Sequence, residues 1–209
     1  MVSERPKRRG EDATPYQNLP GRMAGLDAPG EAGAVSSAST FRACDLASSP
    51  VNRLIYVETS IPSFYFETRP GAQMQARREW TREWWDLARW QDALFTSAVV
   101  IIELRETPDP VKLQEMIDLL APLPRLPYTD EIDTIVEVYL SHKLMPVDSG
   151  GDAHHLALAS FHRCDRLVTW NCKHLANPNK ADQIRLVNSS LGLHTPQLLT
   201  PLEILETTP

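Results

Sequence analysis

The stretch "LIYVETSIPS", Leu54–Ser63, places a charged residue directly after a short apolar run. The run LIYV is rich in β-branched and aromatic residues, which favours a buried strand. Glu58 follows it, then the hydroxyl residues Thr59 and Ser60, and then Pro62. Burying a carboxylate costs free energy, so a strand that ends on Glu58 calls for a compensating partner. The ends of the other predicted strands therefore bear on the role of Glu58.

Segments with strand and helix character alternate after Leu54. Strands are predicted for 54–57, 93–96 and 166–170, and a weaker one, interrupted by prolines, within 123–129. Helices are predicted for 72–91, 97–106 with a Ser97 cap, 110–120, 129–143, 151–163 and 180–193, and 197–205 closes the chain. This alternation predicts an α/β fold with three layers, α/β/α, around a mostly parallel central sheet. Ligands of such sheets bind beyond the carboxyl ends of the strands.

Residues 1–50 differ in composition from residues 51–209. They contain five of the nine glycines, and Tyr16 and Phe41 are their only aromatic residues. Such a segment buries too little apolar surface to offset its ordering entropy. We therefore predict a disordered leader over 1–50, or an upstream extension with Met23 as an internal start, and one domain over 51–209. A functional basic tail at Lys7–Arg9 is a further interpretation.

Composition and charge exclude several classes of protein. The net charge of −6 argues against a protein that coats nucleic acid through bulk positive charge. The three cysteines lack CxxC spacing, which argues against a disulfide framework and a zinc site and predicts a reduced, cytoplasmic chain. No apolar run reaches the length of a membrane span, and the N-terminus does not resemble a secretory signal, so no membrane partner is expected. The phosphate-binding patterns GxGxxG and GxxxxGK[ST] are also missing where a nucleotide-binding fold needs them.

Three acids and one carboxamide follow the predicted strands. Glu58 ends the first strand, Glu103 lies in the helix after the second, Asp152 opens the helix at "GGDAHH", and Asn171 follows "RLVTW". A parallel sheet could gather them at one edge, where clustered carboxylates repel each other unless a cation neutralises them. Oxygen ligands suit Mg²⁺ or Mn²⁺, and such a metal ion promotes phosphodiester hydrolysis.

The stretches "YVETSIPSFYFE", "GDAHHLALAS" and "LVTWNCKHLAN" together resemble the motifs of the PIN domain. They are most similar to its VapC-like branch, the ribonuclease toxins of type II toxin–antitoxin pairs. The resemblance covers about residues 54–205. It implies a Mg²⁺- or Mn²⁺-dependent endoribonuclease that cleaves single-stranded RNA, forms a homodimer, and is held inactive by an antitoxin protein.

The resemblance also implies roles for individual residues. Glu58, Glu103 and Asp152 match the three metal-binding acids of the family, and Asn171 stands where many relatives have a fourth acid after a Thr/Ser-x pattern, here Thr169-Trp170. The first acid is usually Asp, so this chain departs from the family at Glu58 and at Asn171. A catalytically impaired module that binds RNA or a protein partner is the alternative function.

Several neighbouring residues have two interpretations. Thr59 and Ser60 either hydrogen-bond Glu58 and a metal-bound water or cap a helix, and Asn171 also suits an ordinary turn. Asp152 suits a helix N-cap, which is compatible with metal binding. His155 either lines the cleft beside Asp152 or lies on the helix surface; adjacent His154 and His155 point about 100° apart and form no ligand pair.

Tryptophan and arginine residues are interleaved along 77–90. They form either a core-facing helix with a solvated arginine face, a surface for a partner, or a platform on which RNA bases stack. A second basic group consists of Lys173, His174, Lys180 and Arg185. These residues could draw RNA toward the acidic centre.

Overall fold

The structure is a computed structural model that describes residues 53–146 and 151–207. The predicted leader over 1–50 lies outside the described residues. The strands are β1 (Leu54–Val57), β2 (Ala93–Ser97), β3 (Arg125–Leu126), β4 (Arg166–Val168) and β5 (Gln197–Leu199). The helices are α1 (Ser60–Tyr65), α2 (Ala72–Gln91), α3 (Ala98–Leu104), α4 (Pro110–Leu120), α5 (Asp130–Ser141), α6 (Asp152–Phe161), α7 (Pro178–Ser190) and α8 (Pro201–Thr207).

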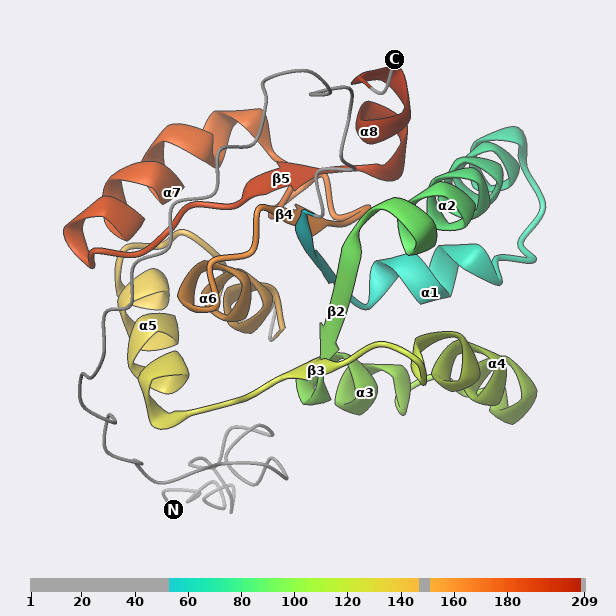
Figure 1. The fold of residues 1–209 in the computed structure, drawn as a ribbon, viewed down its shortest axis with the longest axis horizontal. Coiled ribbons are helices and arrows are strands. Elements are labelled where there is room, and N and C mark those ends of the chain that lie inside the picture. Colours follow the sequence, from blue (N-terminus) through green and yellow to red (C-terminus); the bar gives the residue numbers. More distant parts are fainter. Residues whose placement is uncertain (1–52, 147–150, 208–209) are drawn as a thin grey trace, which may run out of the picture.

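The five strands form one parallel sheet in the order β3-β2-β1-β4-β5, with β1 at its centre (Figure 1). Ile55 of β1 is in register with Leu94 of β2 and with Arg166 of β4. Every strand therefore ends at the same edge. Because β1 and β4 are neighbours, the residues that follow Val57 and Val168 come close together.

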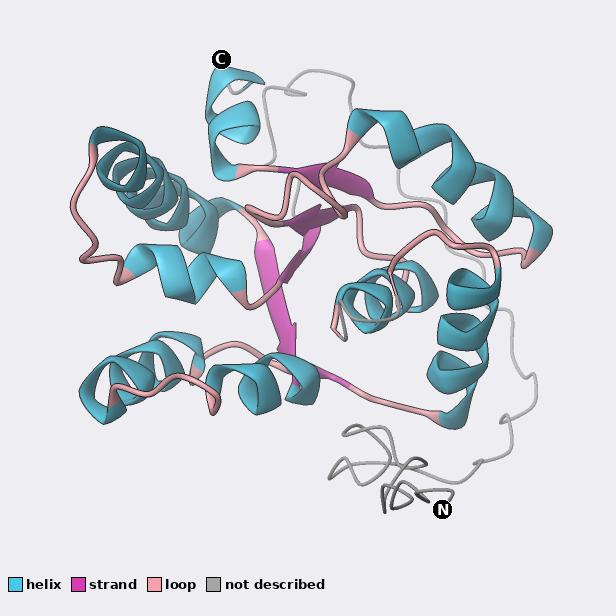
Figure 2. Cartoon of the chain, turned by 180° about the vertical axis from the view of Figure 1, so that it is seen from behind, coloured by secondary structure: helices cyan, strands magenta, loops and turns pink. Residues whose placement is uncertain are grey.

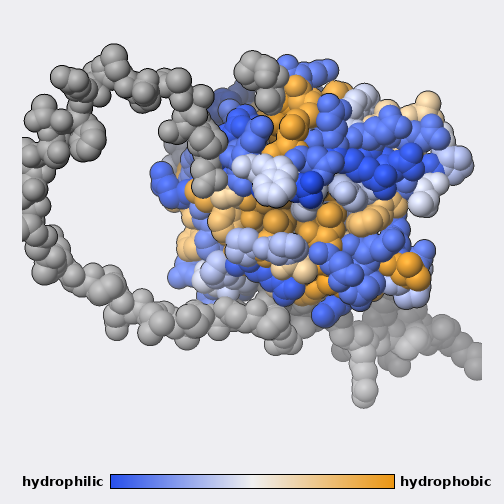
Figure 3. All heavy atoms as spheres, turned by 45° about the vertical axis from the view of Figure 1, so that its right-hand side comes forward, coloured by the Kyte–Doolittle hydropathy of each residue, from blue (hydrophilic) through white to orange (hydrophobic). Residues whose placement is uncertain are grey.

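Helices cover both faces of the sheet. Figures 1 and 2 show α5, α6 and α7 on one side of the sheet, and α1, α2, α4 and α8 on the other. The predicted three-layer α/β/α architecture is confirmed. On the face brought forward in Figure 3, apolar residues form a band between two more polar regions. In the described part of the chain, no helix is long and apolar enough to cross a membrane.

The central strand and the helix α6 form the middle of the core. Ile55, Tyr56 and Val57 are fully buried, as expected for a strand that helices cover on both faces. Every residue of α6 from Asp152 to Ser160 is also buried. The polar side chains at the start of α6 are therefore enclosed by protein and need internal partners.

Helix α2 has the predicted bounds and an unequal distribution of its tryptophans. Trp84 and Trp85 are buried, Trp80 is half-buried, and Trp90 is exposed. Core packing, one of the interpretations of this segment, thus holds for Trp84 and Trp85.

Three local predictions need correction. Ser97 precedes α3, but its hydroxyl makes no cap hydrogen bond and lies 2.7 Å from the Tyr56 hydroxyl oxygen. Asp152 is the first residue of α6 rather than its N-cap, which is Gly151, and its side chain does not cap the helix. The third correction adds the short helix α1, which was not among the predicted helices, although helix capping was one of the two interpretations of Thr59 and Ser60.

Candidate functional site

The carboxyl edge of the sheet brings the four predicted site residues into one polar cluster. Glu58 follows β1, Glu103 comes from α3, Asp152 begins α6, and Asn171 lies shortly after β4. Thr59 and His155 contact Glu103, Ser60 donates to Glu58, and Asn171 donates to Asp152. Residues separated by more than a hundred positions thus meet at the edge that the topology predicts.

Glu58 is buried and bonded to the start of α1. One carboxylate oxygen accepts a hydrogen bond from the Ser60 amide at 2.9 Å, and the other accepts from the Ser60 hydroxyl. The Ser60 hydroxyl oxygen also accepts from the Trp170 amide at 2.7 Å, which joins the ends of β1 and β4. Burial raises the pKa of Glu58, although the charge of His155 and hydrogen bonds from Ser60 and Thr169 oppose that shift.

Glu103 lies across the start of α6. Its Oε2 accepts a hydrogen bond from the Thr59 hydroxyl and lies 2.9 Å from Nε2 of His155. A Cβ atom added to Gly151 would lie only 1.4 Å from Oε1 of Glu103. A side chain at this position would therefore push the flexible end of Glu103 out of its present position.

His155 is the fully enclosed histidine of the cluster. Its Nδ1 lies 2.9 Å from the Tyr56 hydroxyl oxygen, and its Nε2 faces Glu103. Burial alone would lower the pKa of His155, but the carboxylates of Glu103, Glu58 and Asp152 outweigh it and raise the pKa. The sequence already indicated that His155 lies near Asp152, because these two residues are three apart on one helix and therefore share a face. His154 instead stacks on Tyr128, so the two histidines do point in different directions.

Asp152 and Asn171 form a second pair within the cluster. The Asn171 amide nitrogen donates to both carboxylate oxygens of Asp152, at 2.8 and 2.9 Å. The Asn171 amide oxygen accepts from the His174 backbone, and the Asn171 backbone donates to Thr169 Oγ1. Burial raises the pKa of Asp152, opposed by His155, Asn171 and His174 and reinforced by Glu103.

His174 is a residue whose proximity to Asp152 was not predicted. Its charge acts on Asp152, and its Nδ1 is buried without a hydrogen-bond partner in the structure. The only indication in the sequence that His174 lies near Asp152 was its position three residues after Asn171. Two other members of the predicted second basic group have partners away from the cluster: Lys180 donates to the Leu144 carbonyl, and Arg185 donates to Asp182.

The donor chemistry of the cluster fits a divalent cation. Glu58, Glu103 and Asp152 supply only oxygen atoms, which Mg²⁺ and Mn²⁺ prefer, and burial raises the pKa of Glu58 and of Asp152. In the described ranges, 53–146 and 151–207, no three His, Cys, Asp or Glu side chains are placed so that they could hold one metal ion. The carboxylates point at protein donors instead, so sharing a cation requires rotation of their side chains.

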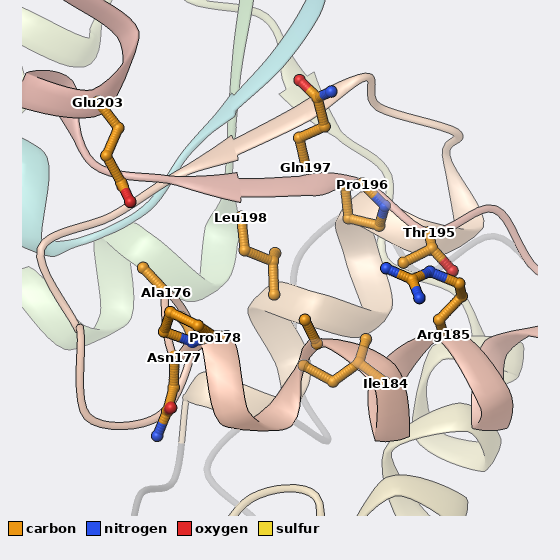
Figure 4. Close-up of a pocket in the computed structure, with 12 residues that line it drawn as sticks. Ala176, Asn177, Pro178, Ile184, Arg185, Thr195, Pro196, Gln197, Leu198 and Glu203 are labelled. Carbon is orange, nitrogen blue, oxygen red and sulfur yellow. The ribbon is translucent and has the colours of Figure 1, made fainter. Parts of the chain in front are cut away.

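A separate cavity of about 580 Å³ lies between α7 and β5 (Figure 4). Ile184 and Leu198 point toward one another across it, and Arg185 and Glu203 also line it. None of the predicted site residues is among its lining residues. This cavity and the polar cluster are therefore two separate places in the protein.

Comparison of the sequence with models of known protein families finds no match, and comparison with curated proteins finds none either.

Proposed function

We propose that the protein is a metal-dependent endoribonuclease that cleaves single-stranded RNA. The observation that carries this proposal is the cluster itself: three carboxylates from three separate segments, two of them buried and that of Glu103 half-buried, meet at the carboxyl edge of a parallel sheet. In two of these acids burial disfavours the charged form and raises the pKa, a penalty that a bound cation would offset. The three motifs that resemble the PIN domain contribute Glu58, Asp152 and Asn171 to it.

Glu58, Glu103 and Asp152 would hold Mg²⁺ or Mn²⁺. When bound, such an ion activates water as a nucleophile and stabilises the charge that develops on a phosphate. Ser60 and Thr59 hydrogen-bond the carboxylates of Glu58 and Glu103, and these contacts would be exchanged for the ion when the side chains rotate toward it. Asn171 fixes both oxygens of Asp152, and Thr169 in turn fixes the Asn171 backbone.

His155 balances the negative charge within the cluster. It lies between the Tyr56 hydroxyl and the Glu103 carboxylate, and it interacts electrostatically with all three acids. A positive charge here lowers the cost of enclosing three carboxylates in the protein. His155 thus positions Glu103 and preserves the cluster.

The biological role that we propose is that of the toxin of a type II toxin–antitoxin pair. We further propose that it acts in the cytoplasm as a homodimer and is inhibited by a cognate antitoxin protein. The resemblance of three motifs to VapC-like toxins supports these assignments. A small adjacent gene for a DNA-binding protein would add further support.

The test is RNA cleavage with and without added Mg²⁺ or Mn²⁺, with the Asp152→Asn variant alongside the wild type. We expect cleavage that needs the metal and falls by about 100-fold or more in the variant, because one metal-binding charge is lost. Far-UV circular dichroism checks that the variant remains folded. Activity that survives both EDTA and the substitution would contradict the mechanism.

A module that binds RNA or a protein without cleaving RNA is the second candidate function. The contact between Asn171 and Asp152 favours this function, because the Asn171 amide already donates a hydrogen bond to each Asp152 oxygen, and these oxygens would otherwise bind the metal. Isothermal titration with Mn²⁺ separates the two functions. RNA binding without any metal binding at millimolar Mn²⁺ would support the second candidate.

A further inference from the structure

An aromatic wall borders the carboxylate cluster on the side of α1 and α2. Trp170, which directly precedes Asn171, stacks on Trp80 with ring centres 6.2 Å apart and packs on Phe64 at 5.9 Å. Its indole nitrogen donates to the Thr81 hydroxyl at 2.7 Å. Its backbone amide donates to Ser60, which itself binds Glu58. Trp170 is thus held at both ends and connects this wall to the site.

Arg77 of α2 lies on this wall. Its guanidinium carbon is 5.1 Å from the ring centre of Trp170 and 5.4 Å from that of Phe64. Stacking on two rings fixes the plane of the guanidinium and leaves its N–H groups to point away from the rings. The side chain is therefore held in place before any ligand binds.

Arg77 differs from the other half-buried arginines among the described residues. Arg53 donates to Asp92, Arg78 to the Glu67 carbonyl and Arg166 to Gln197. The Arg77 guanidinium has no hydrogen bond or ion pair with any residue that the structure describes, and rings are its only described contacts. A fixed, half-buried guanidinium with five free donors is suited to an anion, above all to a planar or bidentate oxygen pair.

The position of Arg77 suggests which anion it binds. RNA that reaches the site must approach three carboxylates, which repel its phosphates. A single-stranded substrate has phosphates on both sides of the one that is cleaved, at the spacing of its backbone. A cation on a neighbouring wall offsets the repulsion without entering the cluster.

We propose that Arg77 binds a backbone phosphate of single-stranded RNA on the α1–α2 side of the site, next to the phosphate that is cleaved. This inference rests on the proposed function for the identity of the ligand. The aromatic rings of Phe64 and Trp170 position the guanidinium, and the phosphate accepts its hydrogen bonds. The contact reads the RNA backbone and not the base sequence.

The experiment measures binding of a short fluorescent single-stranded RNA to the full chain carrying Asp152→Asn, in EDTA, by anisotropy over a range of salt concentrations. Arg77→Gln should weaken binding by about 5- to 10-fold, equally for different sequences, and reduce the slope of log K against log salt by roughly 0.7. Arg77→Lys should retain most of the binding, because the charge persists. Arg89→Gln is the matched control: it lies about 18 Å further along α2 and is paired with Asp86.

The outcomes separate this inference from the proposed function. If the wild-type protein cleaves RNA and the Arg77→Gln substitution changes neither RNA binding nor the salt slope, the inference is overturned and the proposed nuclease function stands. Arg77-dependent binding by a chain that cleaves no RNA with any divalent ion would support the inference and overturn the nuclease. Equal losses in Arg77→Lys and Arg77→Gln, or a lower melting temperature with an unchanged salt slope, would assign Arg77 to packing and overturn the inference.

Discussion

Glu58 and Glu67 lie on either side of α1, and both are almost fully shielded from solvent, at 4% and 5% exposure. The pKa values of these two carboxyl groups are nevertheless shifted in opposite directions. Glu67 is hydrogen-bonded and ion-paired with Arg69, which lowers its pKa to about 2, whereas burial raises the pKa of Glu58. Arg69 is itself well exposed, so the Glu67 pair remains in contact with water.

The difference shows what distinguishes a structural acid from a candidate ligand-binding acid in this fold. Glu67 has a cation of its own, two residues away in the sequence. Glu58 shares one enclosed histidine, His155, with Glu103 and Asp152. Three acids beside one histidine are the reason for the metal-binding proposal, because a further positive charge would offset their mutual repulsion.

The largest stability effect is expected from Asn171→Asp, which adds a fourth carboxylate without a cation. It replaces the amide that donates to both Asp152 oxygens by a like charge, so we expect a loss of about 2–3 kcal/mol in EDTA. The acceptor for the His174 amide is retained. Millimolar Mn²⁺ should restore the melting temperature of the Asn171→Asp variant. It should raise the melting temperature of the wild type by a smaller amount. Unchanged stability in EDTA would contradict the contact between Asn171 and Asp152.

The second prediction compares the two glutamates directly. Glu58→Gln should raise the free energy of unfolding at pH 7 by up to about 1 kcal/mol, because burial penalises the charged carboxylate more than His155 and its hydrogen bonds compensate. Glu67→Gln should lower it by about 1 kcal/mol or less, because a partly solvated ion pair is lost. Chemical denaturation of both variants tests the signs. Cleavage should be lost in Glu58→Gln and kept in Glu67→Gln; two changes of the same sign in stability would break the comparison.

The smallest effect concerns pH. The folded-state pKa of Glu67, about 2, lies below its ordinary value of 4.5, so the stability that it contributes is present above pH 4.5 and is lost as the pH falls toward 2. The difference in unfolding free energy between wild type and Glu67→Gln should therefore shrink across this window. Urea unfolding at several acidic pH values measures it. A difference that stayed constant down to pH 2 would show that the ion pair does not carry the stability.

Periodicity and composition were sufficient to predict most of the fold. The bounds of α2 and α4 agree with prediction, because neither segment contains an internal glycine or proline that would break it. The weak strand β3 was also located correctly, although it has only two residues. The short helix α1 was missed, since a six-residue helix that includes Pro62 has little local signal and forms only in the folded protein.

The candidate site was predictable in its members but not in its contacts. Strand ends in a parallel sheet share one edge, so Glu58, Glu103, Asp152 and Asn171 could be grouped from the order of the segments. The hydroxyl of Thr59 was expected near Glu58, yet it binds Glu103, while Ser60 binds Glu58. Side-chain partners across the cluster depend on the angles at which the elements pack, and the pattern of residue types does not encode those angles.

The sequence by itself determined the alternation of strands and helices and placed an acid at the end of the central strand, because both depend on local residue order and on apolar periodicity. Only the tertiary structure decided which charges meet. It placed His155 among three carboxylates, brought the Glu103 carboxylate against Gly151, and set Arg77 on the rings of Phe64 and Trp170. The physical reason is that charge interactions and desolvation act through space, over distances that only the packed chain defines.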